Sequence, residues 1–152
     1  MAVNSNPAMP ALDRIRLNAD LDELERLTEW LDRFCEGHGI EDAVHYHIAV
    51  AVEEVVINAI KHGQCNPADG AIEIALALSG EDLQIDITDT GIPFNPLELP
   101  TPELGADIAR RKIGGLGVHL VRSLMTRVEY ERLAAGNRLR LSKRIAGENH
   151  AN

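Results

Sequence analysis

Two neighbouring strand-like runs, the first almost wholly apolar and the second alternating apolar and polar residues, constrain the fold of this chain more than any other feature of its sequence. They cover residues 71–78 and 83–89 and are separated by a short turn around Gly80-Glu81-Asp82. Alternation places every second side chain on the same face of a strand, so the pair predicts a β-hairpin with one apolar face. A sheet of this kind needs a second layer to cover that face.

Two amphipathic stretches predict the helices of this second layer. The first is capped by Asn18 or Asp20 and ends near Gly37. The second extends from about residue 41 to residue 62 and is stopped by Gly63. Apolar residues of the first stretch recur at helical spacing, at Leu21, Leu24, Leu27, Leu31 and Phe34.

The remaining segments complete one domain of the α+β class. Strands are expected at residues 14–17, 127–133 and 138–143, a turn at 134–137 and a helix at 118–125. The order β-α-α-β-β-lid-α-β-β predicts a two-layer α/β sandwich, with a mixed, mostly antiparallel sheet and helices on one face.

The expected domain covers residues 12–146, with flexible tails at 1–11 and 147–152. Within it, residues 92–115 are rich in proline and glycine. A connection this long inside a compact domain indicates a functional loop, so we interpret it as a lid, with a short helix near residues 102–111.

Charge and composition exclude several classes of function. The formal net charge is −9, which is unsuited to direct binding of nucleic acid. No apolar run approaches the about 20 residues of a membrane span, and the first residues do not resemble a signal peptide. Cys35 and Cys65 form no CxxC pair and fit free thiols in a reducing compartment. We therefore expect a cytoplasmic protein that enters no membrane.

A carboxylate and a carboxamide share one face of the second helix. Glu54 and Asn58 are four residues apart, a spacing that puts both side chains on the same face. An Asn oxygen can ligate Mg²⁺ alongside phosphate oxygens, and a Glu can accept a proton from a hydroxyl or a water. A solvated face, with Glu54 paired to Lys61, is the alternative for this motif taken alone.

Two glycine-containing turns follow. Asp89 ends a strand, where its carboxylate can accept a hydrogen bond from the exocyclic amine of adenine, and Gly91 would let the backbone pass close to a flat base. Further on, Gly114-Gly115-Leu116-Gly117 opens the third helix, where backbone N–H groups can approach an anion. Taken singly, an ordinary turn and a flexible hinge explain these segments equally well.

The three motifs, in this order, resemble the N, G1 and G2 boxes of the GHKL (Bergerat-fold) ATPases. Residues 54–63, 89–94 and 115–121 look particularly like those of the single-domain anti-sigma-factor serine/threonine kinases. The resemblance extends from about residue 14 to residue 144 and implies the Bergerat ATP-binding fold.

The resemblance also implies roles for individual residues. Asn58 would ligate Mg²⁺ and Glu54 would be the general base. Asp89 would bind the adenine amino group, in a pocket that Gly91 shapes. The other candidate nucleotide-binding residues are Gly115, Leu116 and Gly117, which would border the phosphates, and His62, for which helix-end packing is the alternative.

The implied activity is transfer of the ATP γ-phosphate to a serine or threonine of a STAS-domain anti-anti-sigma protein. The kinase, a homodimer in the resembled family, would regulate a sigma factor by partner switching. An ATP-loaded switch that sequesters a partner without phosphotransfer is the main alternative. The detached catalytic domain of a sensor histidine kinase is disfavoured because no phosphoacceptor helix pair precedes the first strand.

Two sequence features leave undecided which residues contact the phosphates. The last hairpin reads Gly136-Asn137-Arg138, where many members have a hydroxyl residue able to reach phosphate. Arg110, Arg111 and Lys112 lie in the expected lid, where they could touch phosphate or form a solvated basic face.

Overall fold

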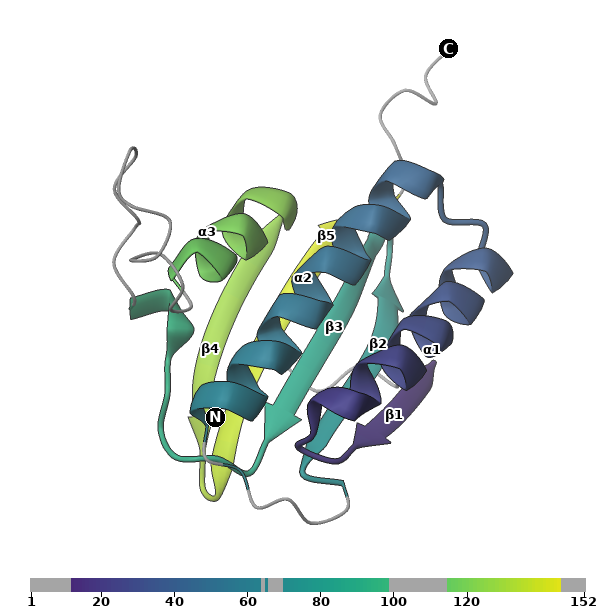
Figure 1. The fold of residues 1–152 in the computed structure, drawn as a ribbon. Coiled ribbons are helices and arrows are strands. Elements are labelled where there is room, and N and C mark those ends of the chain that lie inside the picture. Colours follow the sequence, from purple (N-terminus) through teal and green to yellow (C-terminus); the bar gives the residue numbers. More distant parts are fainter. Residues whose placement is uncertain (1–11, 64, 66–69, 99–114, 146–152) are drawn as a thin grey trace, which may run out of the picture.

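The computed structural model describes residues 12–63, 65, 70–98 and 115–145, which form a two-layer α/β sandwich (Figure 1). One layer is a five-stranded sheet in the order β1-β2-β3-β5-β4, and all four strand pairs are antiparallel. Its strands are β1 Asp13–Leu17, β2 Ile72–Ser79, β3 Asp82–Asp89, β4 Arg127–Leu133 and β5 Gly136–Arg144. The other layer, on one face of the sheet, holds α1 Leu24–Gly37, α2 Asp42–His62 and α3 Gly115–Leu124. The predicted fold class is confirmed.

The predicted hairpin is the pair β2 and β3. Its register joins Ile74 to Ile87 and Leu76 to Ile85, so apolar side chains face one another across the two strands. These side chains are almost completely buried, whereas the intervening Asp86 is partly exposed on the opposite face. The period of two in the sequence therefore reports directly which face the helices cover.

The helix starts and stops follow local chemistry. Asp20 caps the short 3-10 helix η1, Leu21–Glu23, because its carboxylate accepts a hydrogen bond from the Asp22 backbone N–H. That turn leads directly into α1. Helix α2 ends at Gly63, whose N–H bonds to the Ala59 carbonyl. Both helix predictions are confirmed to within a few residues.

Helix α2 is the central helix of the second layer. Its buried residues are Ile48, Ala51, Val52, Val55, Val56, Asn58 and Ala59. Among the described residues, α2 is the one helix whose length and composition would allow it to cross a membrane. This differs from the sequence expectation, but its core side chains pack against the sheet, and the central helix of a globular domain passes the same test.

The last hairpin turns earlier than expected. Leu133 pairs with Gly136, so the turn is Ala134-Ala135, and the predicted turn at 134–137 is too long. Gly136 and Asn137 instead begin β5, where Asn137 pairs in register with Asp89. A further short 3-10 helix, η2 Pro96–Glu98, was not expected.

Several expectations lie wholly or partly outside the described residues. They are the two tails, the helix near residues 102–111, the basic residues Arg110, Arg111 and Lys112, and most of the expected lid at 92–115.

We expect Ile85→Ala to lower the free energy of unfolding by about 2–5 kcal/mol. Ile85 is completely buried in the middle of β3, so truncation leaves a cavity between the sheet and the helices. Urea denaturation measures the change. Ser79→Ala, at the exposed end of β2, is the control and should change stability by less than about 0.5 kcal/mol. Equal effects of the two substitutions would contradict this placement of the core.

Candidate functional site

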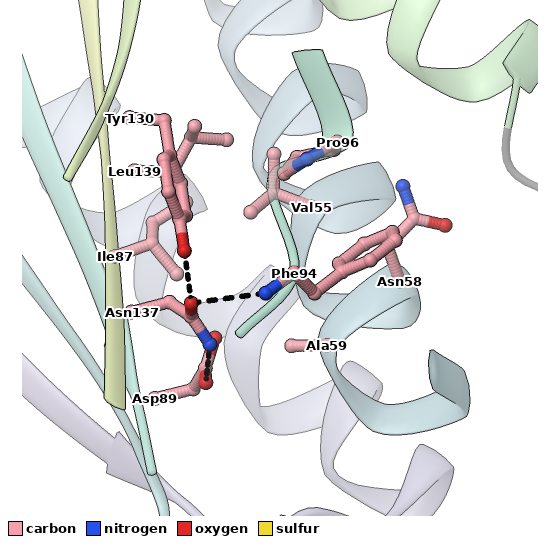
Figure 2. Close-up of a pocket in the computed structure, with 10 residues that line it drawn as sticks. All are labelled: Val55, Asn58, Ala59, Ile87, Asp89, Phe94, Pro96, Tyr130, Asn137 and Leu139. Carbon is pink, nitrogen blue, oxygen red and sulfur yellow. Dashed lines mark hydrogen bonds between the residues drawn. The ribbon is translucent and has the colours of Figure 1, made fainter. Parts of the chain in front are cut away.

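A small cavity of about 30 Å³ lies between α2, the sheet and the segment that follows β3. The wall is mostly apolar, with a few polar groups, and is formed by Val55, Asn58, Ala59, Ile87, Asp89, Phe94, Pro96, Tyr130, Asn137 and Leu139 (Figure 2). Such a lining suits a flat heterocycle whose edge is recognised by hydrogen bonds.

Asp89 is held at the end of β3 with its carboxylate in a defined orientation. Its Oδ1 accepts hydrogen bonds from the Gly91 backbone N–H at 2.8 Å and from Asn137 Nδ2 at 2.9 Å. The second oxygen, Oδ2, takes part in neither bond. An ionised carboxylate has hydrogen-bond acceptors and no donor. The Asp89 side chain is therefore suited to an exocyclic amine on a ligand in the cavity.

Gly91 is required by a close approach of two chain segments. A Cβ atom at this position would overlap the carbonyl oxygen of Gly63, at the end of α2, and would lie 2.9 Å from its carbonyl carbon. The same oxygen accepts a hydrogen bond from the Ile92 N–H at 2.8 Å. The loop after β3 is therefore fastened to the end of α2, which brings Asp89 beside the helix that carries Asn58.

Asn58 is a buried polar side chain on the cavity wall, 6% exposed. None of the described residues forms a hydrogen bond with its carboxamide. Its amide atoms are not among the buried polar atoms that lack a partner, so the carboxamide keeps access to solvent and is available to a ligand. In Figure 2 the Asn58 carboxamide lies on the other side of the Phe94 ring from Asp89 and Asn137, so the polar groups mark two ends of the site.

Glu54 lies one helical turn before Asn58 and packs against the start of α3. A Cβ atom on Gly117 would overlap the Glu54 carboxylate, so the absence of a side chain at Gly117 makes this contact possible. Burial, and then the charge of neighbouring Glu53, raise the pKa of the Glu54 carboxyl above its ordinary value, while Lys61 opposes the shift. A raised pKa is typical of a carboxylate that accepts protons near neutral pH.

We expect Glu54→Gln to stabilise the protein at pH 7. The folded state raises the pKa of Glu54, so it binds more protons than the unfolded state between the two pKa values, and stability falls as pH rises through this window. Glu54→Gln does not lose stability in this way as pH rises. Its excess free energy of unfolding over the wild type should therefore shrink as pH falls through the raised pKa of Glu54. Thermal unfolding at several pH values measures the difference. If the wild type were more stable than Glu54→Gln at pH 7, the claim that burial of the Glu54 charge destabilises the folded state would be wrong.

Of the remaining predicted site residues, His62 and Gly117 are not among the described residues that line the cavity. The His62 ring lies 6.0 Å from the Phe94 ring, centroid to centroid, so it borders the cavity wall through Phe94. Gly115, Leu116 and Gly117 are in the first turn of α3. The structure thus brings Asn58 and Asp89 together at one cavity, with the Gly91 N–H bonded to Asp89. Glu54 lies against Gly117.

The cavity also contains polar residues that the sequence alone did not assign to it. Asn137 is 4% exposed and bonds to Asp89, and Tyr130 donates its hydroxyl hydrogen to Asn137 Oδ1. Both residues come from the β4–β5 hairpin, which lies next to β3 in the sheet although it is far away in sequence. The alternation of residues in β4 and β5 indicates which side chains share a face of the sheet. It does not indicate the register of β5 against β3, which decides that Asn137 meets Asp89.

Comparisons with known sequences identify the family and several relatives of this chain. The family model of the histidine kinase-like ATPase domain matches residues 17–143. The serine-protein kinase RsbW of Listeria monocytogenes serotype 4a is 30% identical over 86 residues, covering 54% of this chain and 55% of the relative. The serine/threonine-protein kinase BtrW of Bordetella bronchiseptica is 23% identical over 119 residues, covering 78% of this chain and 84% of the relative. The chain spans about half the length of the RsbW relatives it matches.

Solved structures share the fold at low sequence identity. The structure of the RsbU and RsbW domains of Rv1364c from Mycobacterium tuberculosis has a TM-score of 0.67 at 20% identity, covering 90% of this chain and 33% of that chain. The histidine kinase domain of a blue-light activated kinase from Erythrobacter litoralis has a TM-score of 0.52 at 21% identity, covering 92% and 66%. Since the family model also matches most of its length, this chain belongs to the family of histidine kinase-like ATPase domains.

Proposed function

We propose that this protein binds Mg²⁺-ATP and transfers the γ-phosphoryl group to a serine or threonine of a protein partner. The observation that carries the proposal is one apolar cavity with the Asp89 carboxylate at one end and, at the other, the Asn58 carboxamide, which bonds to none of the described residues. The names of the relatives, serine-protein kinase RsbW and serine/threonine-protein kinase BtrW, support the choice of reaction.

The proposed pose places the two ends of the nucleotide at these two groups. The adenine ring lies against the apolar wall and its amino group donates a hydrogen bond to Asp89. The Asn58 side-chain oxygen is a hard ligand of the type that Mg²⁺ prefers, which fits a carboxamide that the described residues leave without a bond. Mg²⁺, when bound, neutralises charge on the phosphates during transfer.

Glu54 is the proposed general base. Its carboxylate lies one turn from Asn58 on the same helix, which puts it near the phosphate end of the pose. In the ionised form it would accept the proton of the attacking hydroxyl as that oxygen bonds to the γ-phosphorus, while the bond from the γ-phosphorus to the bridging oxygen breaks and ADP leaves. Gly117, in contact with Glu54, allows the start of α3 to approach this end, where helix N–H groups can face the phosphates.

The first experiment is calorimetric titration of the protein with ATP, with and without Mg²⁺. We expect Mg²⁺-dependent binding that Asp89→Asn weakens by about tenfold or more, because an acceptor for the adenine amine becomes a poorer one. Asn58→Ala should remove most of the Mg²⁺ dependence. Asp86→Asn is the matched control, because Asp86 is on the same strand but bonds to Arg140 on the opposite face of the sheet. Absence of ATP binding by the wild type would refute the proposal.

We further propose that the partner is a STAS-domain anti-anti-sigma protein, that a sigma factor is the regulated target, and that the working unit is a homodimer. Labelled ATP incubated with such a STAS-domain protein should yield phosphoserine or phosphothreonine on it. Phosphohistidine would instead indicate a histidine kinase. ATP-dependent binding of the partner with no transfer would support the switch that sequesters its partner.

A further inference from the structure

Asn137 has a role in this site that the proposed function leaves open. It is the second residue of β5, is 4% exposed and pairs in register with Asp89. Its Nδ2 donates to Asp89 Oδ1 at 2.9 Å and to the Ile92 carbonyl at 2.8 Å. Its Oδ1 accepts from the Phe94 backbone N–H at 3.2 Å and from the Tyr130 hydroxyl (Figure 2). Both ends of the carboxamide are therefore fully used.

These partners permit one orientation of the amide. The Phe94 N–H can only donate, and the Asp89 carboxylate and the Ile92 carbonyl can only accept. A flipped amide would direct its oxygen at two acceptors and its NH₂ at a donor. Asn137 thus presents one N–H to Asp89 and the other to the Ile92 carbonyl as a fixed feature of the fold, and a hydroxyl residue could not make all of these contacts.

The consequence for Asp89 is that its two oxygens become unequal. Among the described residues, the Gly91 N–H and Asn137 Nδ2 both donate to Oδ1, which restricts the rotation of the carboxylate. The Cys65 thiol also interacts with this carboxylate. Oδ2 takes part in neither of these two bonds, so we expect it to be the oxygen that a ligand in the cavity meets. A carboxylate held by a single bond from Gly91 would rotate more freely and would present either oxygen.

We propose that Asn137 is a positioning residue that sets the base preference of the pocket by holding Asp89 so that Oδ2 reads an exocyclic amine. This inference rests on the proposed binding of ATP. A base with a carbonyl oxygen in place of the amine presents an acceptor to the Asp89 carboxylate. That carboxylate has no hydrogen to donate, and its fixed orientation prevents it from rotating to another partner. A fixed carboxylate therefore rejects that base more strongly than a mobile one does, because polar groups left unpaired in a buried site weaken binding.

The test compares ATP with inosine triphosphate, which carries the carbonyl oxygen, by calorimetric titration. We expect the wild type to favour ATP by about tenfold or more, and Asn137→Ala to reduce this ratio by at least about fivefold. Asn137→Asp is the second variant, because it keeps the shape and the acceptor for Phe94 but loses the N–H that holds Asp89 and the N–H that bonds Ile92. It should reduce the ratio in the same direction. Thermal unfolding confirms that each variant is folded.

Arg138→Ala is the matched control. Arg138 is the next residue of β5, and its side chain forms an ion pair with Glu131 away from the cavity. It should leave the ratio of the two affinities unchanged. A double-mutant cycle with Asp89→Asn adds a stricter condition, since Asn137→Ala should change the ratio little once Asp89 is replaced.

The outcomes separate this inference from the proposed function. A ratio that stays at the wild-type value in Asn137→Ala and Asn137→Asp, with both affinities lowered equally, would show a merely structural role and overturn the inference alone. A wild type that binds ATP and inosine triphosphate equally would also overturn it, while ATP binding stands. A wild type that binds neither nucleotide would overturn the proposed function as well.

Discussion

Glu54→Gln is expected to bind Mg²⁺-ATP with nearly wild-type affinity and to lose about 10²–10⁴-fold in the rate of phosphoryl transfer. Glutamine has the size of glutamate and keeps the contact with Gly117, but it cannot accept a proton. The binding step should therefore survive, while the step that needs a base should not. Single-turnover transfer from labelled ATP to a STAS-domain partner measures the rate, and calorimetry measures the affinity.

The pH dependence of the transfer adds an independent check on this residue. Because the pKa of Glu54 is raised, the ionised base is lost at a higher pH than for an ordinary glutamate, so the rate should rise with pH through that raised value. Glu73→Gln is the matched control, since Glu73 is also partly exposed but pairs with Arg14 on the other face of the sheet. A wild-type transfer rate in Glu54→Gln would exclude Glu54 as the general base. The rate of transfer would then depend on how the site positions Mg²⁺-ATP and the attacking hydroxyl.

Gly91→Ala is expected to weaken ATP binding by about tenfold or more and to lower the free energy of unfolding by about 1–3 kcal/mol. The added methyl would overlap the Gly63 carbonyl oxygen and lie 3.1 Å from Asp89 Oδ1. The loop must then move away from the end of α2. That movement displaces the Gly91 N–H from Asp89 and breaks the bond between Ile92 and Gly63.

Gly37→Ala provides the comparison for this substitution. Gly37 is the last residue of α1, and a Cβ there would have no atom within 4 Å. It should leave ATP binding unchanged and leave stability equal or slightly higher, because alanine is the better helix former. Calorimetry and urea denaturation of both variants give the two quantities. Wild-type ATP affinity in Gly91→Ala would show that the close approach of this loop to α2 does not shape the pocket.

Periodicity predicted most of the fold because it records burial directly. The alternation in residues 83–89 and the helical spacing of Leu27, Leu31 and Phe34 each identify a face that must be covered, and all of these side chains are buried where expected. Helix ends were predictable for a similar reason, since Asp20 and Gly63 act on backbone groups within a few residues. The short 3-10 helix at Pro96–Glu98 had no such local signal.

The sequence by itself determined the sandwich, the helix face shared by Glu54 and Asn58, and the strand-end position of Asp89, because each depends on neighbours within one turn or one strand. The tertiary structure alone decided that Asn137 reaches Asp89, 48 positions away in sequence. That contact depends on the register of β5 against β3 and on the two-residue turn that precedes β5. Register is set by the packing of whole strands against the helices, so the orientation of the base-reading carboxylate belongs to the assembled sheet rather than to any local motif.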